Sequence, residues 1–189
     1  MIVYRAVDPS FFPQYDQIPM VVHVDREFRL ERRLDGTGWE LREEAVPPYD
    51  KDLGSYERAT AYASQFDISH WGFVMAFDGD RPVGGCTLVC RTPGVDMLEG
   101  RDDLCVLWDL RVADGYRRQG IGQALFDRGI AWAQARRLRW MKIESQHNNV
   151  PAGRFYQKQG AVLCEVNEHA YTGSPELERE LQLIWYREL

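Results

Sequence analysis

The sequence predicts a single α/β domain over residues 1–189, built on a mixed sheet, and three observations lead to this fold class. The length of 189 residues and the 44% hydrophobic content suit one domain with a sizeable core. Two apolar segments flank Asp78-Gly-Asp-Arg81, which is typical of a β-hairpin. An apolar strand at 104–112 precedes helical spacing over about 119–137, and a further strand follows at 140–146.

The remaining elements follow from the spacing of apolar residues and from capping and turn residues. The predicted strands are Ile2–Val7, Phe28–Leu34, Trp39–Ala45, Trp71–Phe77, Pro82–Cys90, Leu104–Val112, Trp140–Gln146, Val162–Asn167 and Leu181–Tyr186. The predicted helices are Ser55–Phe66 with Ser55 as its cap, the segment 119–137, and a helix that starts at Asn148-Asn-Val-Pro151 and stops at Gly160. Residues 8–24 contain three prolines and are expected to form a loop with a helical turn.

An accessory β-ribbon is expected at about 26–46. Its two strands flank Asp35-Gly-Thr-Gly38, whose glycines suit a hairpin turn, and Pro47-Pro48 is expected to end it. Charged and apolar residues alternate along both strands, which favours an exposed ribbon. Its role is open between a wall of the substrate site and a contact in a homodimer.

Composition excludes several classes of protein. No run of 18 apolar residues exists and the N-terminus lacks the features of a signal peptide, so we expect a cytoplasmic protein with no membrane partner. The net charge of −6 disfavours nucleic acid. Cys86, Cys90 and Cys105 lie in apolar stretches and are expected to be structural thiols. The four histidines form no H-x-x-x-H pair, so we expect no metal site.

Charge is unevenly distributed along the chain. The window 110–160 carries ten Lys and Arg residues and three acids, whereas residues 1–103 carry 11 bases and 19 acids. A window of charge +7 in an acidic protein indicates a polyanionic ligand on one side and a cationic ligand on the other.

The segment Arg117-Arg-Gln-Gly-Ile-Gly122 is the most informative part of the chain. It lies between a buried strand and a helix, where unpaired N–H groups and the helix dipole favour an anion. Glycines at 120 and 122 let an oxyanion approach the backbone, and two arginines add positive charge. Leu125 replaces the third glycine of a dinucleotide fingerprint, and no Gly-Lys-Ser/Thr of a P-loop is present.

Two signatures in this order resemble those of the GNAT family of N-acetyltransferases. Arg117–Gly122 matches R/Q-x-x-G-x-G/A, and Asn149-Val-Pro-Ala-Gly-Arg-Phe-Tyr-Gln-Lys-Gln-Gly160 matches N-x-x-A-x-x-F-Y-x-K-x-G. The resemblance covers residues 71–189 well and the first 70 weakly. Ala161 departs from the aromatic residue usual after the glycine. The resemblance implies the GNAT fold, with a mixed, mostly antiparallel central sheet flanked by helices.

Four shorter stretches look most like the streptothricin acetyltransferases within this family, although they are less specific than the two signatures. These are Leu107–Val112, Lys142–Gln146, His169–Tyr171 and Gln182–Tyr186. The subgroup implies acetylation of an amine on a cationic antibiotic.

The family resemblance also implies which residues bind acetyl-coenzyme A, the co-substrate. Its pyrophosphate would sit on the amides of Arg118, Gln119, Gly120, Ile121 and Gly122, with Arg117 nearby. Pantetheine would pair as an added strand with Leu110, Arg111 and Val112. Asn149, Ala152 and Phe155 would border the cofactor arm, and simple helix capping is an alternative role for Asn149.

The reaction requires that a protonated amine lose a proton and that a thiolate gain one. By resemblance, Tyr156 is the candidate acid beside the sulfur; a core aromatic role is the alternative. Asp109 is the candidate base or amine-binding group, because burying a carboxylate in an apolar strand costs free energy and is typical of an ion pair or a functional site. A salt bridge to a nearby arginine is the alternative. Glu144 and Glu165, on neighbouring strands, are weaker rivals of Asp109. Three further acids are candidates for attracting a cationic substrate, with a solvated charged loop as the alternative: Glu176, Glu178 and Glu180. Trp71 and Trp108 are expected to be core residues or to wall the acceptor site.

We therefore expect an acetyl-coenzyme A-dependent N-acetyltransferase that acts on a small cationic amine such as a streptothricin-like antibiotic. Two alternatives stay open at this point. In the first alternative, the acceptor is a protein or peptide amine. In the second, the chain is a regulatory module that binds acyl-coenzyme A without turnover.

Overall fold

The computed structural model describes residues 1–189, which divide into two compact units. The first unit consists of Met1–Val21, Asp52–Ile143 and Arg187–Leu189, and the second of Val22–Lys51 and Glu144–Tyr186.

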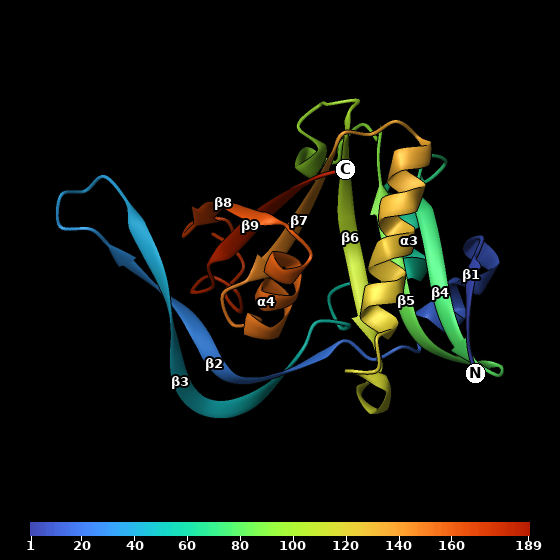
Figure 1. Ribbon diagram of the computed structural model, residues 1–189, viewed down its shortest axis with the longest axis horizontal. Coiled ribbons are helices and arrows are strands. Elements are labelled where there is room, and N and C mark those ends of the chain that lie inside the picture. Colours follow the sequence, from blue (N-terminus) through green and yellow to red (C-terminus); the bar gives the residue numbers. More distant parts are fainter. The chain divides into compact units, whose positions relative to one another are not determined.

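The first unit is built on a mixed sheet of mainly antiparallel strands (Figure 1). Its strands, in spatial order, are β1 (Ile2–Ala6), β4 (Gly72–Asp78), β5 (Arg81–Val89), β6 (Leu104–Val112) and the first part of β7 (Trp140–Gln146). Only the β6–β7 pair in this order is parallel. The mixed α/β class with a mostly antiparallel sheet is thus confirmed.

Helices and turns cover both faces of this sheet. Helix α3 (Ile121–Ala135) packs on β4, β5 and β6, as Figure 1 shows, and buries a stripe that includes Ile121, Leu125 and Phe126. The opposite face carries an aromatic core around Tyr15, Tyr62 and Trp71. The short elements that supply or support this core are η1 (Pro9–Phe11), α1 (Phe12–Tyr15), η2 (Ala59–Ala61), α2 (Tyr62–Gln65), η3 (Asp96–Leu98) and η4 (Asp114–Tyr116).

A β-bulge interrupts the pairing of β5 with β6. Thr87 lies opposite Asp109 and Leu88 lies opposite Leu107, so Trp108 is the extra residue on β6. Such a bulge bends its strand and redirects the neighbouring side chains. Both effects matter for the site, because Asp109 follows the bulge directly.

The predicted helix Ser55–Phe66 is wrong at its start. The Ser55 hydroxyl donates to the Asp52 carbonyl oxygen instead of capping a helix, and helical turns begin only at Ala59. The carboxylate of Asp16 accepts hydrogen bonds from the Ala59 amide at 2.7 Å and from the Thr60 hydroxyl at 2.6 Å. A distant acid therefore supplies the cap, and spacing along the chain could not reveal it.

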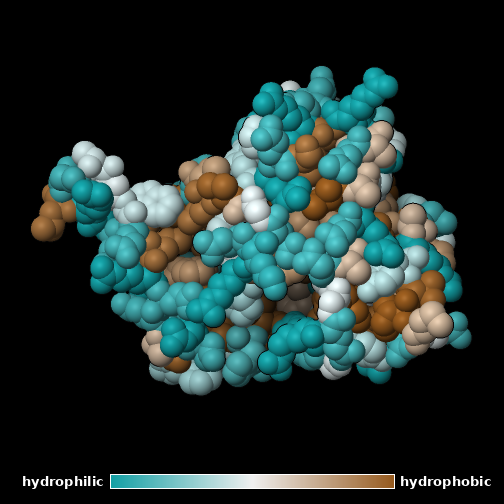
Figure 2. Space-filling view, in the orientation of Figure 1, coloured by the Kyte–Doolittle hydropathy of each residue, from teal (hydrophilic) through white to brown (hydrophobic).

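The second unit contains a long ribbon and a small strand pair with a helix. The ribbon consists of β2 (Val21–Arg32) and β3 (Trp39–Asp52), and it extends beyond the 26–46 expected. The other elements are α4 (Val150–Lys158), β8 (Val162–Asn167) and β9 (Gln182–Glu188), and β8 pairs antiparallel with β9. The ribbon tip is mostly hydrophilic in Figure 2, with hydrophobic atoms at its end, where Leu34 is fully exposed.

The expectation that Pro47-Pro48 ends the ribbon is wrong, because β3 continues through both prolines to Asp52. A two-stranded ribbon has an outer edge on each strand, where a missing N–H breaks no ladder hydrogen bond. Prolines are therefore tolerated in it.

Three of the four cysteines, Cys86, Cys90 and Cys105, are buried as free thiols, as expected, and Cys164 is exposed. Burial raises the pKa of the Cys105 thiol to about 12 and also raises the pKa of Cys90 and Cys86. None of the helices is both long and apolar enough to traverse a bilayer.

Candidate active site

The turn before α3 presents a row of backbone N–H groups. The first hydrogen bond within the helix runs from the Ala124 amide to the Gly120 carbonyl oxygen at 2.9 Å. The amides of residues 118–123 donate to no backbone acceptor. Because a helix dipole is positive at this end, this row of amides, the amide cradle, suits an oxyanion at the place where the sequence predicts one.

Two glycines keep this amide cradle open. Gly120 has a φ of +82°, a conformation that residues with a Cβ rarely adopt. A Cβ placed on Gly122 would meet only Val112 Cγ2, at 3.7 Å, and would otherwise project into open space. The cradle therefore has room for phosphate oxygens close to the backbone, which fits the pyrophosphate of a coenzyme A.

The two arginines of the turn have different surroundings. Arg117 donates through Nε to the Val112 carbonyl oxygen at 3.1 Å, contacts the Val21 carbonyl oxygen, and pairs with Asp114 Oδ1 at 3.0 Å. It therefore ties the turn to neighbouring segments. Arg118 is exposed with a φ of +60° and has no partner, so it is the arginine that remains available to a phosphate.

Strand β6 has a free edge next to the cradle. Its parallel register with β7 runs from Leu104 opposite Trp140 to Leu107 opposite Ile143 and ends there. On the other side, Leu110 and Val112 still pair with β5. The edge of β6 away from β5 thus leaves main-chain groups unpaired beyond the bulge, where an extended ligand can add as a strand.

Asp109 and Arg111 form a buried ion pair. Arg111 Nε donates to Asp109 Oδ2 at 2.7 Å, and the side chains of both residues are 1% exposed. Burial by itself would lower the pKa of Arg111, but the charge and the hydrogen bond of Asp109, together with Tyr15 and Tyr62, outweigh burial and raise it. The ion-pair alternative for Asp109 is therefore observed. Its second oxygen, Oδ1, is buried and has no hydrogen-bond partner.

The predicted residues of the second unit lie on α4. The side chain of Asn149 caps this helix by accepting from the Ala152 amide at 3.2 Å, so the capping role is present. Tyr156 is 8% exposed, and its ring packs edge-on against Phe155 at 5.6 Å between centroids. Asn149, Ala152, Phe155 and Tyr156 thus share one helix, whereas Asp109 and the cradle belong to the first unit.

The weaker acidic candidates separate into two groups. Glu144 accepts from the Tyr171 hydroxyl at 2.6 Å and from Gln182 at 2.8 Å, and Glu180 binds Lys51 and Asn148. Glu165, Glu176 and Glu178 are exposed. Glu180 is therefore held in a polar network, unlike the solvated loop of acids that its sequence suggests.

Partners neutralise much of the positive window at 110–160. Arg111, Arg117 and Lys142 each pair with an acid of the first unit. Arg154 pairs with Glu43 within the second unit. Formal charge along the sequence thus overstates the positive potential, and the amide cradle with Arg118 is the stronger indication of an anion site.

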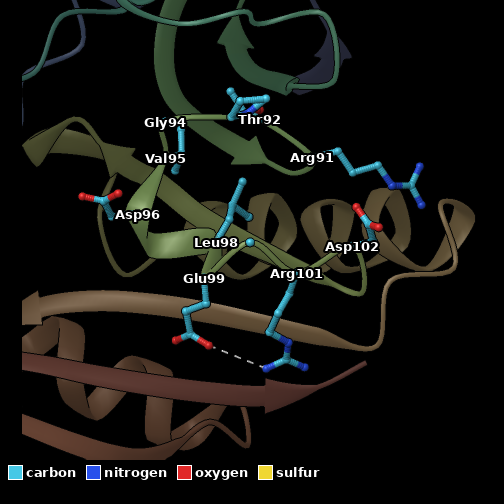
Figure 3. Close-up of a pocket in the computed structure, with 11 residues that line it drawn as sticks. Arg91, Thr92, Gly94, Val95, Asp96, Leu98, Glu99, Arg101 and Asp102 are labelled. Carbon is cyan, nitrogen blue, oxygen red and sulfur yellow. Dashed lines mark ion pairs between the residues drawn. The ribbon is translucent and has the colours of Figure 1, made fainter.

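The loop between β5 and β6 encloses a separate open pocket of about 520 Å³. Figure 3 shows the Glu99 and Arg101 side chains extending to the same side of this loop, and their charged groups lie 3.9 Å apart. None of the predicted site residues lines this pocket.

Sequence reasoning missed two polar side chains at the bulge. Glu57 accepts from the Trp108 indole nitrogen at 2.7 Å, and the buried Tyr62 hydroxyl interacts with the same carboxylate. Neither residue belongs to a motif, because only the folded chain brings residues 57 and 62 to β6. Trp71 and Trp108 pack on each other with ring centroids 5.5 Å apart, beside the aromatic core.

The amide cradle, the free edge of β6 and the mixed sheet fit the class that the sequence resemblance implies, a transferase that uses an acyl-coenzyme A. Comparison with known proteins agrees. Residues 38–161 match the model of the acetyltransferase (GNAT) family. The chain belongs to this family, and the predictions of the family, of its fold and of an acetyl-coenzyme A-dependent N-acetyltransferase are confirmed.

The chain is also similar to individual antibiotic acetyltransferases. It is 28% identical to the streptothricin acetyltransferase of Escherichia coli over 81% of this chain and 78% of that protein. A crystal structure of nourseothricin acetyltransferase has a TM-score of 0.79 at 22% identity and covers 99% of this chain and 98% of that one. A Bacillus anthracis structure in complex with acetyl coenzyme A has a TM-score of 0.78 at 21% identity, with 100% and 98% covered.

Proposed function

We propose that this protein transfers the acetyl group of acetyl-coenzyme A to an amine of a small cationic acceptor of the streptothricin class. The row of unpaired amides at 118–123 carries the proposal for the donor, because it lies beside the free edge of β6. The similarity to the streptothricin and nourseothricin acetyltransferases supports the proposal for the acceptor.

We assign the donor as follows. The pyrophosphate binds the amides of 118–122 and the Arg118 side chain, while Arg117 holds the turn in shape. Pantetheine pairs with the free edge of β6 at 110–112 and leads the thioester toward the bulge. Asn149, Ala152 and Phe155 border the arm, as the family resemblance implies.

We further propose that Tyr156 donates a proton to the leaving thiolate. Asp109 helps to bind the amine, since its Oδ1 is free to accept an N–H while Oδ2 is held by Arg111. Attack by the neutral amine on the acetyl carbon then breaks the carbon–sulfur bond and yields an amide and free coenzyme A.

The amide cradle can be tested at Gly122. We expect Gly122→Val to raise the KM for acetyl-coenzyme A at least about tenfold, equivalent to about 1.4 kcal/mol, because the larger side chain projects toward the phosphate position. Gly122→Ala is the matched control, since the family signature accepts alanine there. Neither change is expected to lower the melting temperature, because glycine is itself a poor helix former. Equal KM values for both variants would contradict the cradle.

The acceptor can be identified with an amine panel. Purified protein and acetyl-coenzyme A are incubated with streptothricin, other small cationic amines and peptides, and products are identified by mass spectrometry. We expect acetylated streptothricin-like amines and release of the coenzyme A thiol. Preferential acetylation of peptides would instead favour a protein acceptor, and binding of acetyl-coenzyme A without any product would favour a regulatory module.

A further inference from the structure

A cluster of buried polar groups lies at the bulge of β6 in the first unit. It contains the Asp109–Arg111 ion pair and the hydroxyl of Tyr62, which is 1% exposed. Asp109 Oδ1 is a buried side-chain atom without a hydrogen-bond partner, and the Tyr62 hydroxyl interacts with the Glu57 carboxylate. Leaving a polar atom buried and unpaired costs about 1–3 kcal/mol, so Asp109 Oδ1 indicates a ligand that supplies the missing hydrogen-bond donor.

Glu57 stands at the accessible side of this cluster. It is partly exposed, and one of its carboxylate oxygens accepts the Trp108 indole N–H at 2.7 Å. Trp108 is the bulge residue itself, so this hydrogen bond fixes the carboxylate beside the point where β6 leaves its pairing. Asp109, in contrast, is buried and is held by the guanidinium of Arg111.

We propose that Glu57 is the catalytic residue that removes the proton from the acceptor amine, and that Tyr62 and Asp109 orient the amine from the buried side. This inference rests on the proposed N-acetyltransferase function and adds a base that no motif indicates. A cationic amine supplies N–H donors for Asp109 Oδ1 and for Glu57, which matches the partners that the cluster lacks.

The proton and bond changes balance. The ammonium form of the acceptor gives one proton to Glu57, which frees the nitrogen lone pair. A nitrogen–carbon bond forms at the acetyl carbon, the carbon–sulfur bond breaks, and the thiolate takes a proton for which Tyr156 is the proposed donor. The nitrogen loses its second proton, which restores that donor, and Glu57 releases its own proton to water. One ammonium and one thioester thus give one amide, one thiol and one proton.

The surroundings of Glu57 suit a base. Burial raises the pKa of Glu57 and the negative charge of Asp109 raises it further, while hydrogen bonds from Trp108 and Tyr62 and the charge of Arg111 lower it. Burial and the nearby carboxylates also raise the pKa of Tyr62, so Tyr62 faces Glu57 as a neutral hydroxyl. A base with a raised pKa accepts a proton from an ammonium group more readily than an ordinary glutamate.

The pH dependence of Glu57→Gln tests the proposal. The base acts when it is deprotonated, so wild-type kcat/KM should rise with pH through the Glu57 pKa, above the ordinary glutamate value of about 4.3. We expect Glu57→Gln to lower kcat about 100-fold or more and to remove this acidic limb of the pH profile. The remaining pH dependence of kcat/KM should come only from the ionisation of the acceptor amine. Binding of acetyl-coenzyme A should be unchanged, which also shows that the variant is folded.

Two further variants separate the outcomes. Glu57→Asp should restore part of kcat and the acidic limb, and Asp80→Asn, an exposed acid at the β4–β5 turn, should leave both unchanged. Wild-type turnover with an unaltered kcat in Glu57→Gln would overturn the role of Glu57 while the proposed function stands. Loss of the acidic limb in Asp109→Asn but not in Glu57→Gln would also overturn it. Wild-type protein without turnover of any amine would refute the proposed function itself.

Discussion

Replacing Arg111 by methionine is expected to lower the free energy of unfolding by about 3–5 kcal/mol, because it leaves the carboxylate of Asp109 buried without its counter-charge. Asp109→Asn should destabilise the protein similarly by leaving the guanidinium unpaired. In the double variant, the loss of unfolding free energy should be clearly smaller than the sum of the losses in the two single variants, since both charges are removed together.

Urea denaturation followed by circular dichroism gives these free energies at neutral pH. Arg5→Met is the control, because Arg5 is an exposed cation whose guanidinium lies 5.3 Å from the centre of the Phe77 ring. It should change stability by less than about 1 kcal/mol. If the free-energy losses of the two single variants simply add in the double variant, Asp109 and Arg111 are not energetically coupled, contrary to the structure.

Tyr156→Phe is expected to lower kcat by a factor of about 100 to 10,000, the usual contribution of a positioned general acid. The ring remains, so packing against Phe155 and the KM for acetyl-coenzyme A should change little. Steady-state kinetics with the acceptor from the amine panel measure the effect.

Tyr186→Phe provides the matched control for Tyr156. Tyr186 is a half-buried tyrosine of the same unit, on β9, and loss of its hydroxyl should leave kcat within about twofold of wild type, because it has no role in proton transfer. An unchanged kcat in Tyr156→Phe would show instead that Tyr156 is only a packing aromatic.

The sequence predicts those helices and strands whose ends are set by neighbouring residues. The bounds of β6 and β7 agree with prediction to the residue, and α4 starts after Asn149, because glycine, proline and a capping asparagine act on neighbouring residues. These signals also identify the amide cradle. They are sufficient there because the amides of this cradle are consecutive along the chain.

The missed features depend on residues far apart in the sequence. The carboxylate of Asp16, 43 residues away in the sequence, caps the turn at Ala59. Because the local sequence does not show this cap, the predicted helix start at Ser55 is wrong. The bulge at Trp108 arises from pairing with β5 and brings in Glu57, whose surrounding sequence has no motif. Ion pairs such as Lys142 with Glu99 likewise cancel charges that appear free along the chain.

The state of the cysteines makes the reaction easy to follow. Reagents that exchange with thiols attack the thiolate, and burial keeps Cys86, Cys90 and Cys105 protonated and out of reach in the folded protein. Only the exposed Cys164 should contribute to the background when a disulfide dye detects released coenzyme A. A Cys164→Ser enzyme should therefore support a continuous colorimetric assay with almost no protein signal, and the same dye would report unfolding by the appearance of three further thiols.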